Sequence, residues 1–193
     1  MLKSEIRILG FDDGAFVPRS KNPVFVIGVI YRGGKILDGA LTTTVTVDGM
    51  DATEKIFKLI NQSRHKQQLK VIMFDGITLG GFNVLDIKKI RRQTGIPVIV
   101  INRKHPNLAR VKKALKNFED GDERWRIILR AGKIKECEIK DGKKIYYQNI
   151  GIDNDETEEV INLSTTRGYI PEPLRVAHLL ATAVVRGESY GRA

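Results

Sequence analysis

The chain has 193 residues, of which 41% are hydrophobic and 29% are charged. This balance is typical of a globular protein, and the length suffices for one core, so we expect a single domain over residues 1–193. The longest apolar runs have the length of a strand, which excludes a membrane-spanning helix of roughly 20 residues. The first residues lack the apolar stretch of a secretory signal, so we expect a cytoplasmic protein without a membrane partner.

Charge and cysteine content limit which partners and which kinds of site the sequence can have. Lysine and arginine number 33 against 23 acidic residues, which gives a formal net charge of +10. A basic chain attracts phosphate backbones, so DNA or RNA is the expected partner, although a lysine-rich surface without a partner has the same charge. Cys137 is the sole cysteine, so an internal disulfide and a cysteine-rich zinc site are excluded. Composition specifies no oligomeric state.

The first half of the chain begins with strand patterns and then alternates between helix and strand patterns. Gly33-Gly34 between two β-rich runs predicts a hairpin. Ile56, Leu59 and Ile60 recur at the spacing of one helical face. The expected strands cover residues 5–12, 24–31, 36–47, 70–75 and 97–101, and the expected helices cover residues 51–66, about 86–95 and about 107–117.

The remaining elements complete one α/β fold. Asp86 is a typical helix N-cap, and Gly95 is a typical helix end. Asp141-Gly142 predicts a second hairpin, and two helices are expected near residues 154–165 and 173–187. An antiparallel meander followed by parallel βαβ strands, with helices on the flanks, is the order of an RNase H-like mixed sheet.

Acidic residues gather at the ends of the expected strands. Asp12 and Asp13 end the first strand, Asp48 ends the third with Asp51 just beyond it, and Asp75 ends the fourth. Open sheets build their sites at strand ends. Converging carboxylates can hold Mg²⁺ or Mn²⁺, which lowers the pKa of a bound water and neutralises charge on a phosphate. We expect Asp12 and Asp75 to be metal ligands, and all five acids are candidates for catalysis.

Each acid also has a structural interpretation. Asp48 and Asp75 precede glycines and can belong to turns, and Asp51 can cap a helix. Asp13 points away from Asp12 if both are extended. The metal hypothesis therefore depends on Asp12 and Asp75 lying on strands that this fold makes adjacent.

Four segments spread over nearly the whole chain carry a family resemblance: "GFDDGAF", "VDGMDAT", "FDGITLGGFNVLDI" and "GYIPEPLRVAH". Together they resemble the archaeal endonuclease dU family, formerly uncharacterised and similar to endonuclease V, which repairs or processes nucleic acids holding deaminated bases. The resemblance implies a Mg²⁺-dependent endonuclease that cuts phosphodiester bonds in DNA or RNA, at uracil or hypoxanthine.

The resemblance also implies roles for single residues. "GFD" makes Asp12 the counterpart of the first metal ligand of endonuclease V, and "MFDG" makes Asp75 the counterpart of the second. "PVIVINRK" resembles a strand that ends in a phosphate-facing lysine, a role that falls to Arg103 or Lys104. "IPEPLRVAH" resembles a late helix that mainly packs, so His178 is expected to be structural.

Two departures from endonuclease V stand out. Its strand-end wedge and the glutamate after it are absent, so Asp48, Asp51 or Glu54 must supply a third carboxylate. Its histidine before the penultimate helix has no match near "YYQNIGIDND". These departures favour an alternative function, a nucleic-acid-binding protein on the same fold that has lost catalysis.

The glycine-rich segment of residues 76–83, "GITLGGFN", follows Asp75. We expect it to be a mobile loop beside the site, with Gly80 and Gly81 allowing close approach of backbone to a phosphate or sugar. A third interpretation is an enzyme acting on small phosphorylated molecules. The segment matches neither a P-loop nor a dinucleotide-binding fingerprint, which disfavours that interpretation.

Overall fold

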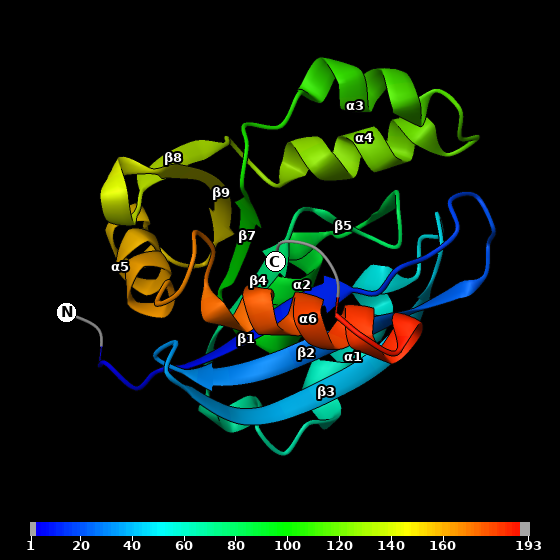
Figure 1. Cartoon of the computed structure of the whole chain (residues 1–193). Helices are drawn as coiled ribbons and strands as arrows, with labels where there is room; N and C mark the ends of the chain where they lie inside the picture. Colours follow the sequence, from blue (N-terminus) through cyan, green and yellow to red (C-terminus); the bar gives the residue numbers. More distant parts are fainter. Residues whose placement is uncertain (1–2, 190–193) are drawn as a thin grey trace.

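The computed structural model describes residues 3–189, and these residues form a seven-stranded mixed sheet flanked by helices (Figure 1). The strand order is β3-β2-β1-β4-β7-β9-β8, and β5 and β6 form a separate two-stranded sheet. The strands are β1 (Arg7–Asp13), β2 (Pro23–Arg32), β3 (Ile36–Thr46), β4 (Leu69–Asp75), β5 (Thr78–Leu79), β6 (Asn83–Val84), β7 (Val98–Asn102), β8 (Lys135–Glu138) and β9 (Lys144–Ile150).

Six α-helices are described in the same part of the chain. They are α1 (Ala52–Gln62), α2 (Ile87–Thr94), α3 (Leu108–Leu115), α4 (Gly121–Arg130), α5 (Asn154–Ser164) and α6 (Glu172–Arg186), and short 3₁₀ turns cover Lys66–Gln68 and Lys140–Gly142. None of the helices within residues 3–189 is long and apolar enough to cross a membrane.

The sheet has the predicted mixture of directions. Strand β2 pairs antiparallel with both β1 and β3, whereas β1 pairs parallel with β4 and β4 pairs parallel with β7. Strands β4 and β7 are short apolar runs with buried centres, which is typical of parallel strands covered on both faces. The predicted RNase H-like fold class is thus confirmed.

Local signals set several of the boundaries. Gly33 and Gly34 both have positive φ in the β2–β3 turn, and β8 and β9 form the expected second hairpin. The Asp86 side chain accepts a hydrogen bond from the Lys89 backbone N–H at 2.9 Å, and Gly95 ends helix α2 with φ of 78°. Helix α4 has no counterpart among the predicted elements.

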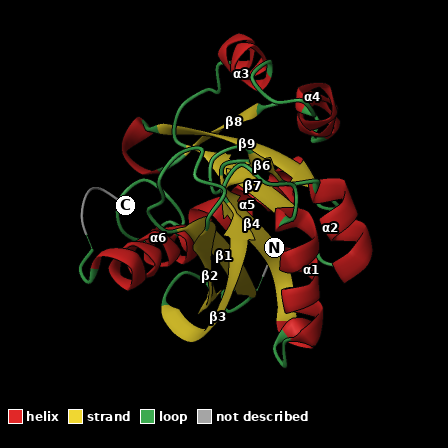
Figure 2. Cartoon of the chain, turned by 90° about the vertical axis from the view of Figure 1, so that its right-hand side faces the viewer, coloured by secondary structure: helices red, strands yellow, loops and turns green. Residues whose placement is uncertain are grey.

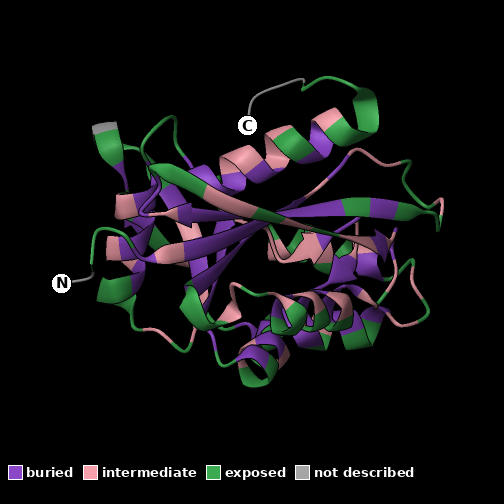
Figure 3. Cartoon of the chain, turned by 90° about the horizontal axis from the view of Figure 1, so that it is seen from below, coloured by how far each residue is buried: buried purple, intermediate pink, exposed green. Residues whose placement is uncertain are grey.

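Helices cover the two faces of the sheet. Leu9 and Phe11 of β1 point into a core shared with Ile56 of α1 and Ile90 of α2. Ile8 points to the other face, into a core shared with α5 and the start of α6. Figure 2 shows α1 and α2 on one side of the sheet and α6 on the other, and Figure 3 shows the buried residues concentrated along the sheet.

Helix α6 approaches β1 closely because β1 carries a glycine at the contact. A Cβ atom on Gly10 would lie 2.6 Å from the Cβ of Pro173 and 2.9 Å from the backbone nitrogen of Leu174. Because side chains alternate along a strand, Gly10 and Asp12 share the face that α6 covers. The glycine therefore brings α6 over the end of β1, beside Asp12.

We expect Gly10→Ala to lower the free energy of unfolding by about 1–3 kcal/mol, the usual effect of overpacking a core. Chemical denaturation measures this change. Gly39→Ala is the matched control, because a Cβ there would meet first the end of the His65 ring, at 3.1 Å, which can shift. Equal stabilities of the two variants would contradict the close approach of α6.

Candidate active site

Asp12 and Asp75 end two neighbouring parallel strands. Phe11 of β1 pairs with Phe74 of β4, and the two acids are the next residue on each strand, at matching height. Asp12 is 6% exposed. Both acids line an open cleft of about 670 Å³ at this end of the sheet, together with His178 from α6. The structure thus brings the two proposed metal ligands together.

The surroundings of Asp12 include a residue that the sequence analysis assigned to packing. His178 Nδ1 lies 2.7 Å from one carboxylate oxygen of Asp12, and the other oxygen accepts a hydrogen bond from the Asp13 backbone N–H at 2.9 Å. The hydrogen bond to Asp12 raises the pKa of His178 above its usual value. His178 is therefore a functional candidate and not only a packing residue of a late helix.

Asp75 is paired with a cation from the next strand. Arg103 follows β7, and its guanidinium lies 3.0 Å from the Asp75 carboxylate. Burial raises the pKa of Asp75 and the charge of Asp12 raises it further, while Arg103 opposes both effects. Lys104 lines the same cleft, so both candidates for a phosphate contact lie at the site.

Asp13 connects the cleft to the glycine-rich segment. Asp13 lines the cleft, and its carboxylate accepts a hydrogen bond from the Gly80 backbone N–H at 2.7 Å. Burial and the neighbouring charge of Asp12 raise the pKa of Asp13 to about 7. The raised pKa of Asp13 shows how strongly burial and the charge of Asp12 disfavour a further negative charge at this end of β1.

Asp48 and Asp51 hold the chain in place and are not among the residues that line the described cleft. Asp48 accepts hydrogen bonds from the backbone N–H groups of Phe82 and Arg19, at 2.9 and 3.2 Å. It has a φ of 54°, which is uncommon for a residue other than glycine.

The contacts of Asp51 are internal as well. Asp51 stands at the start of α1 but makes no side-chain cap, because its carboxylate accepts from the Thr46 backbone N–H at 3.1 Å and from the Asn83 amide at 2.6 Å. Glu54 is exposed and pairs with Lys58 at 2.6 Å. The third carboxylate that the resemblance to endonuclease V requires is therefore not supplied to the cleft by Asp48, Asp51 or Glu54.

The segment of residues 76–83 differs from the mobile loop that we expected. It folds into the β5–β6 hairpin, with Gly80 buried against Val24 and Gly81 beside the Asp48 carboxylate. Neither glycine is among the residues lining the described cleft, so neither is placed to contact a phosphate there. Positive φ values of 55° and 86° explain why both positions are glycine.

The donor set at the cleft fits a metal ion that is shared with a substrate. Within residues 3–189, no three His, Cys, Asp or Glu side chains gather closely enough to enclose an ion. Mg²⁺ does not need such an enclosure, since it commonly takes one or two carboxylates together with waters and substrate phosphates. Asp12 and Asp75 provide two carboxylates whose mutual repulsion a cation relieves.

Comparison with known proteins assigns the family. The model of the endonuclease dU family matches residues 4–185. A UPF0215 protein of Methanothermobacter thermautotrophicus is 54% identical over all of this chain and 94% of its own length. A crystal structure of a protein of unknown function from Archaeoglobus fulgidus is 38% identical with a TM-score of 0.84, covering 94% of this chain and 99% of that one.

Endonuclease V structures share the fold at low identity. Human ENDOV has a TM-score of 0.61 at 15% identity, covering 95% of this chain and 86% of its own. Ciona intestinalis endonuclease V, in complex with DNA containing an inosine, has a TM-score of 0.62 at 12% identity, covering 95% and 87%. At these identities the likeness shows the fold alone.

We expect Asp51→Ala to lower the free energy of unfolding by about 1–3 kcal/mol, because it leaves polar groups at Thr46 and Asn83 without their acceptor. Chemical denaturation measures the loss, and Glu188→Ala, at an exposed acid, is the control. A loss no larger than that of the control would contradict the structural role of Asp51.

The stabilisation that Asp51 provides should depend on pH. Burial alone would raise the pKa of Asp51, but hydrogen bonds from Lys55, Thr46 and Asn83 outweigh it and lower the pKa to about 2. A pKa lowered by folding stabilises the protein above the unfolded value of about 4, and this contribution is lost as the pH falls towards 2. The stability difference between wild type and Asp51→Ala should therefore shrink over that interval.

Proposed function

The chain belongs to the endonuclease dU family, and on this basis we propose that it is a divalent-metal-dependent endonuclease that cuts nucleic acid at the Asp12–Asp75 cleft. The observation that carries the proposal is the pairing of two carboxylates, buried Asp12 and half-buried Asp75, at the ends of adjacent parallel strands. Arg103, Lys104 and His178 surround them in the same cleft. Metal-assisted phosphodiester hydrolysis uses carboxylates that hold a cation and positive groups that bind the phosphate.

Asp12 and Asp75 would hold Mg²⁺ or Mn²⁺, which supplies an activated water and neutralises charge on the phosphate. Residues of the chain itself would orient the substrate and bind its phosphates. The Nδ1 contact with Asp12 fixes the orientation of the His178 ring. That contact also raises the pKa of His178, which favours the protonated ring, and a protonated ring would offer its Nε2–H as a hydrogen-bond donor to a phosphate oxygen. Arg103 and Lys104, which line the same cleft, would bind the phosphate backbone beside the cut bond.

We further propose a deaminated base, uracil or hypoxanthine, as the substrate feature. Two findings support this: the family's name, and the use of inosine-containing DNA as the ligand of an endonuclease V with the same fold. Either DNA or RNA satisfies the cleft, because the contacts proposed for Arg103 and Lys104 are to the backbone.

One observation favours the alternative of a binding protein without catalysis. Within residues 3–189, no third carboxylate joins Asp12 and Asp75 closely enough to complete an enclosed metal site. A cleavage assay separates the two functions. Labelled oligonucleotides carrying uracil, hypoxanthine, a mismatch or no lesion are incubated with Mg²⁺ or Mn²⁺. Binding to the panel without any metal-dependent product would establish the alternative.

We expect Asp12→Asn and Asp75→Asn each to reduce cleavage by about 10²–10³-fold, the scale on which one electrostatic contributor to a transition state acts. Each variant should fold at least as stably as wild type without metal, because it removes one of two repelling charges. Asp86→Asn, which alters a helix cap away from the cleft, is the control and should keep its activity. Wild-type cleavage by Asp75→Asn would refute the proposed site.

A further inference from the structure

We propose that the α3–α4 hairpin is a second nucleic-acid contact, where an unpaired base stacks on Trp125 while the adjoining phosphates bind Lys112 and Lys116. The proposal rests on the proposed function in one respect, that nucleic acid is the ligand. It adds a surface outside the cleft and predicts a preference for single-stranded or locally opened substrate.

The positive charge of the chain is concentrated in the segment that forms this hairpin. Residues 102–118 contain six of the chain's 33 lysines and arginines and none of its 23 acids. Two of these cations, Arg103 and Lys104, line the cleft. Others are exposed on α3 or directly after it: Arg110, Lys112, Lys113 and Lys116. Such a row of like charges complements a phosphate backbone.

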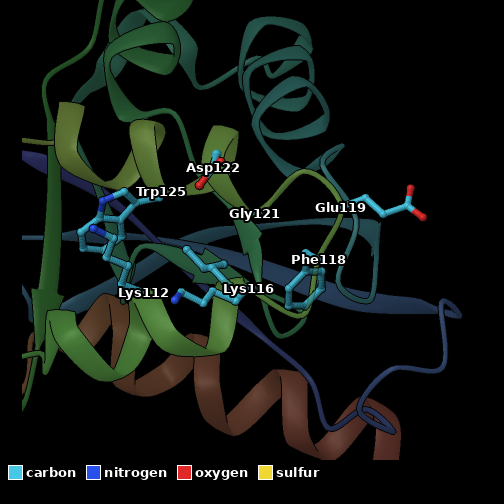
Figure 4. Close-up of a pocket in the computed structure, with 8 residues that line it drawn as sticks. Lys112, Lys116, Phe118, Glu119, Gly121, Asp122 and Trp125 are labelled. Atoms are coloured by element: carbon cyan, nitrogen blue, oxygen red, sulfur yellow. The ribbon is translucent and has the colours of Figure 1, made fainter.

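A cavity of about 330 Å³ lies between the two helices, within the roughly 300–1,000 Å³ range of small-ligand sites. Figure 4 shows Lys112 beside Trp125, with Lys116 and Phe118 on the same side and Asp122 across the cavity on α4. The Lys112 ammonium lies over the Trp125 ring, 5.6 Å from its centroid, so a base that stacks on this face displaces the ammonium towards the adjoining phosphate. An aromatic face with lysines beside it is the combination that binds single strands, because any base can stack on it.

The charges around the cavity also set the path of the backbone. Asp122 and Glu123 occupy the first turn of α4, opposite the lysines of α3. Their charges repel phosphates from the α4 side, so the backbone follows α3. Glu119 also lines the cavity, but its carboxylate extends away from Lys112, Lys116 and Trp125 (Figure 4).

The hairpin is anchored so that the cavity is preformed. The Arg124 side chain is 4% exposed and pairs with Asp120 at 2.7 Å. It also donates to the backbone carbonyls of Phe82, at 2.6 Å, and of Asp48, at 3.0 Å. Trp125 follows Arg124 directly, so these contacts fix its backbone, and its ring packs against the apolar cluster that includes Leu115 and Ile128.

The hairpin is also continuous with the cleft. Strand β7 ends at Asn102, and only residues 103–107 separate it from the start of α3. Figure 1 shows α3 and α4 beyond the end of β7. A strand that leaves the cleft past Lys104 therefore meets the lysines of α3 next.

Trp125 is the only tryptophan of the chain, so its fluorescence reports on the cavity directly. The whole protein is titrated in EDTA with single-stranded oligothymidylate and with an abasic oligonucleotide of equal length, and binding is followed independently by anisotropy. We expect saturable quenching by the first, and binding without quenching by the second, which has phosphates but no bases. Binding of both should weaken steeply with salt.

The variants test the two parts of the surface. Lys112→Ala/Lys116→Ala should lower the slope of log affinity against log salt by about 1.4, because each phosphate that a lysine neutralises on a single strand adds about 0.7 to that slope. Trp125→Ala should weaken oligothymidylate binding and leave abasic binding unchanged, and Trp125→Phe should restore most of the affinity. Lys35→Ala/Lys70→Ala removes equal charge at the opposite end of the sheet and is the matched control.

Three results would overturn the proposal: saturated binding without quenching, quenching by the abasic strand equal to that by oligothymidylate, or equal decreases of the salt slope in the two lysine pairs. The lesion panel is also tested for cleavage in Mg²⁺. This assay distinguishes failure of the hairpin contact from failure of the proposed nuclease. Cleavage without any Trp125 response refutes the hairpin contact alone. Quenching that meets the expectations above, in a protein that cleaves nothing, supports the hairpin and refutes the nuclease.

Discussion

The parallel pairing of β1 with β4 is the constraint on which the site depends. It sets Asp12 and Asp75 side by side, on strands that lie about 4.8 Å apart, at the floor of an open cleft. Two such carboxylates repel each other, and the raised pKa of Asp75 expresses that repulsion together with burial. Arg103 and His178 partly offset it in the protein alone. When substrate binds, a divalent cation would neutralise the remaining negative charge of the two carboxylates, and a phosphate would bind to that cation.

A second cluster of contacts supports both the cleft and the α3–α4 hairpin. Asp48 ties residues 17–22 to the β5–β6 hairpin, and Arg124 ties α4 to the carbonyl of Asp48. Asp13 links the β5–β6 hairpin to the end of β1 through Gly80. The acids that do not line the cleft therefore keep the neighbouring loops fixed, and a cleft that binds phosphates benefits from such fixed surroundings.

The sequence could predict most of the fold and the centre of the site, because both depend on local patterns. Periodicity located the strands, and the order of elements implied that the strands ending in Asp12 and Asp75 are neighbours. The contact of His178 with Asp12 could not be predicted, because it joins residues 166 positions apart and depends on how closely α6 approaches Gly10. The roles of Asp48 and Asp51 depend on partners in β3 and residues 76–83, although turn and cap preferences already indicated structural roles. Helix α4 was missed because Arg124 interrupts its apolar face with a charge that only tertiary contacts satisfy.

The most direct test of the shared metal site is the location of Mn²⁺ in crystals of the protein, by anomalous scattering. The account predicts one peak in contact with the carboxylates of both Asp12 and Asp75, and its disappearance in Asp75→Asn crystals. Mn²⁺ bound away from both carboxylates, in a protein that cleaves nucleic acid with Mn²⁺, would contradict the account.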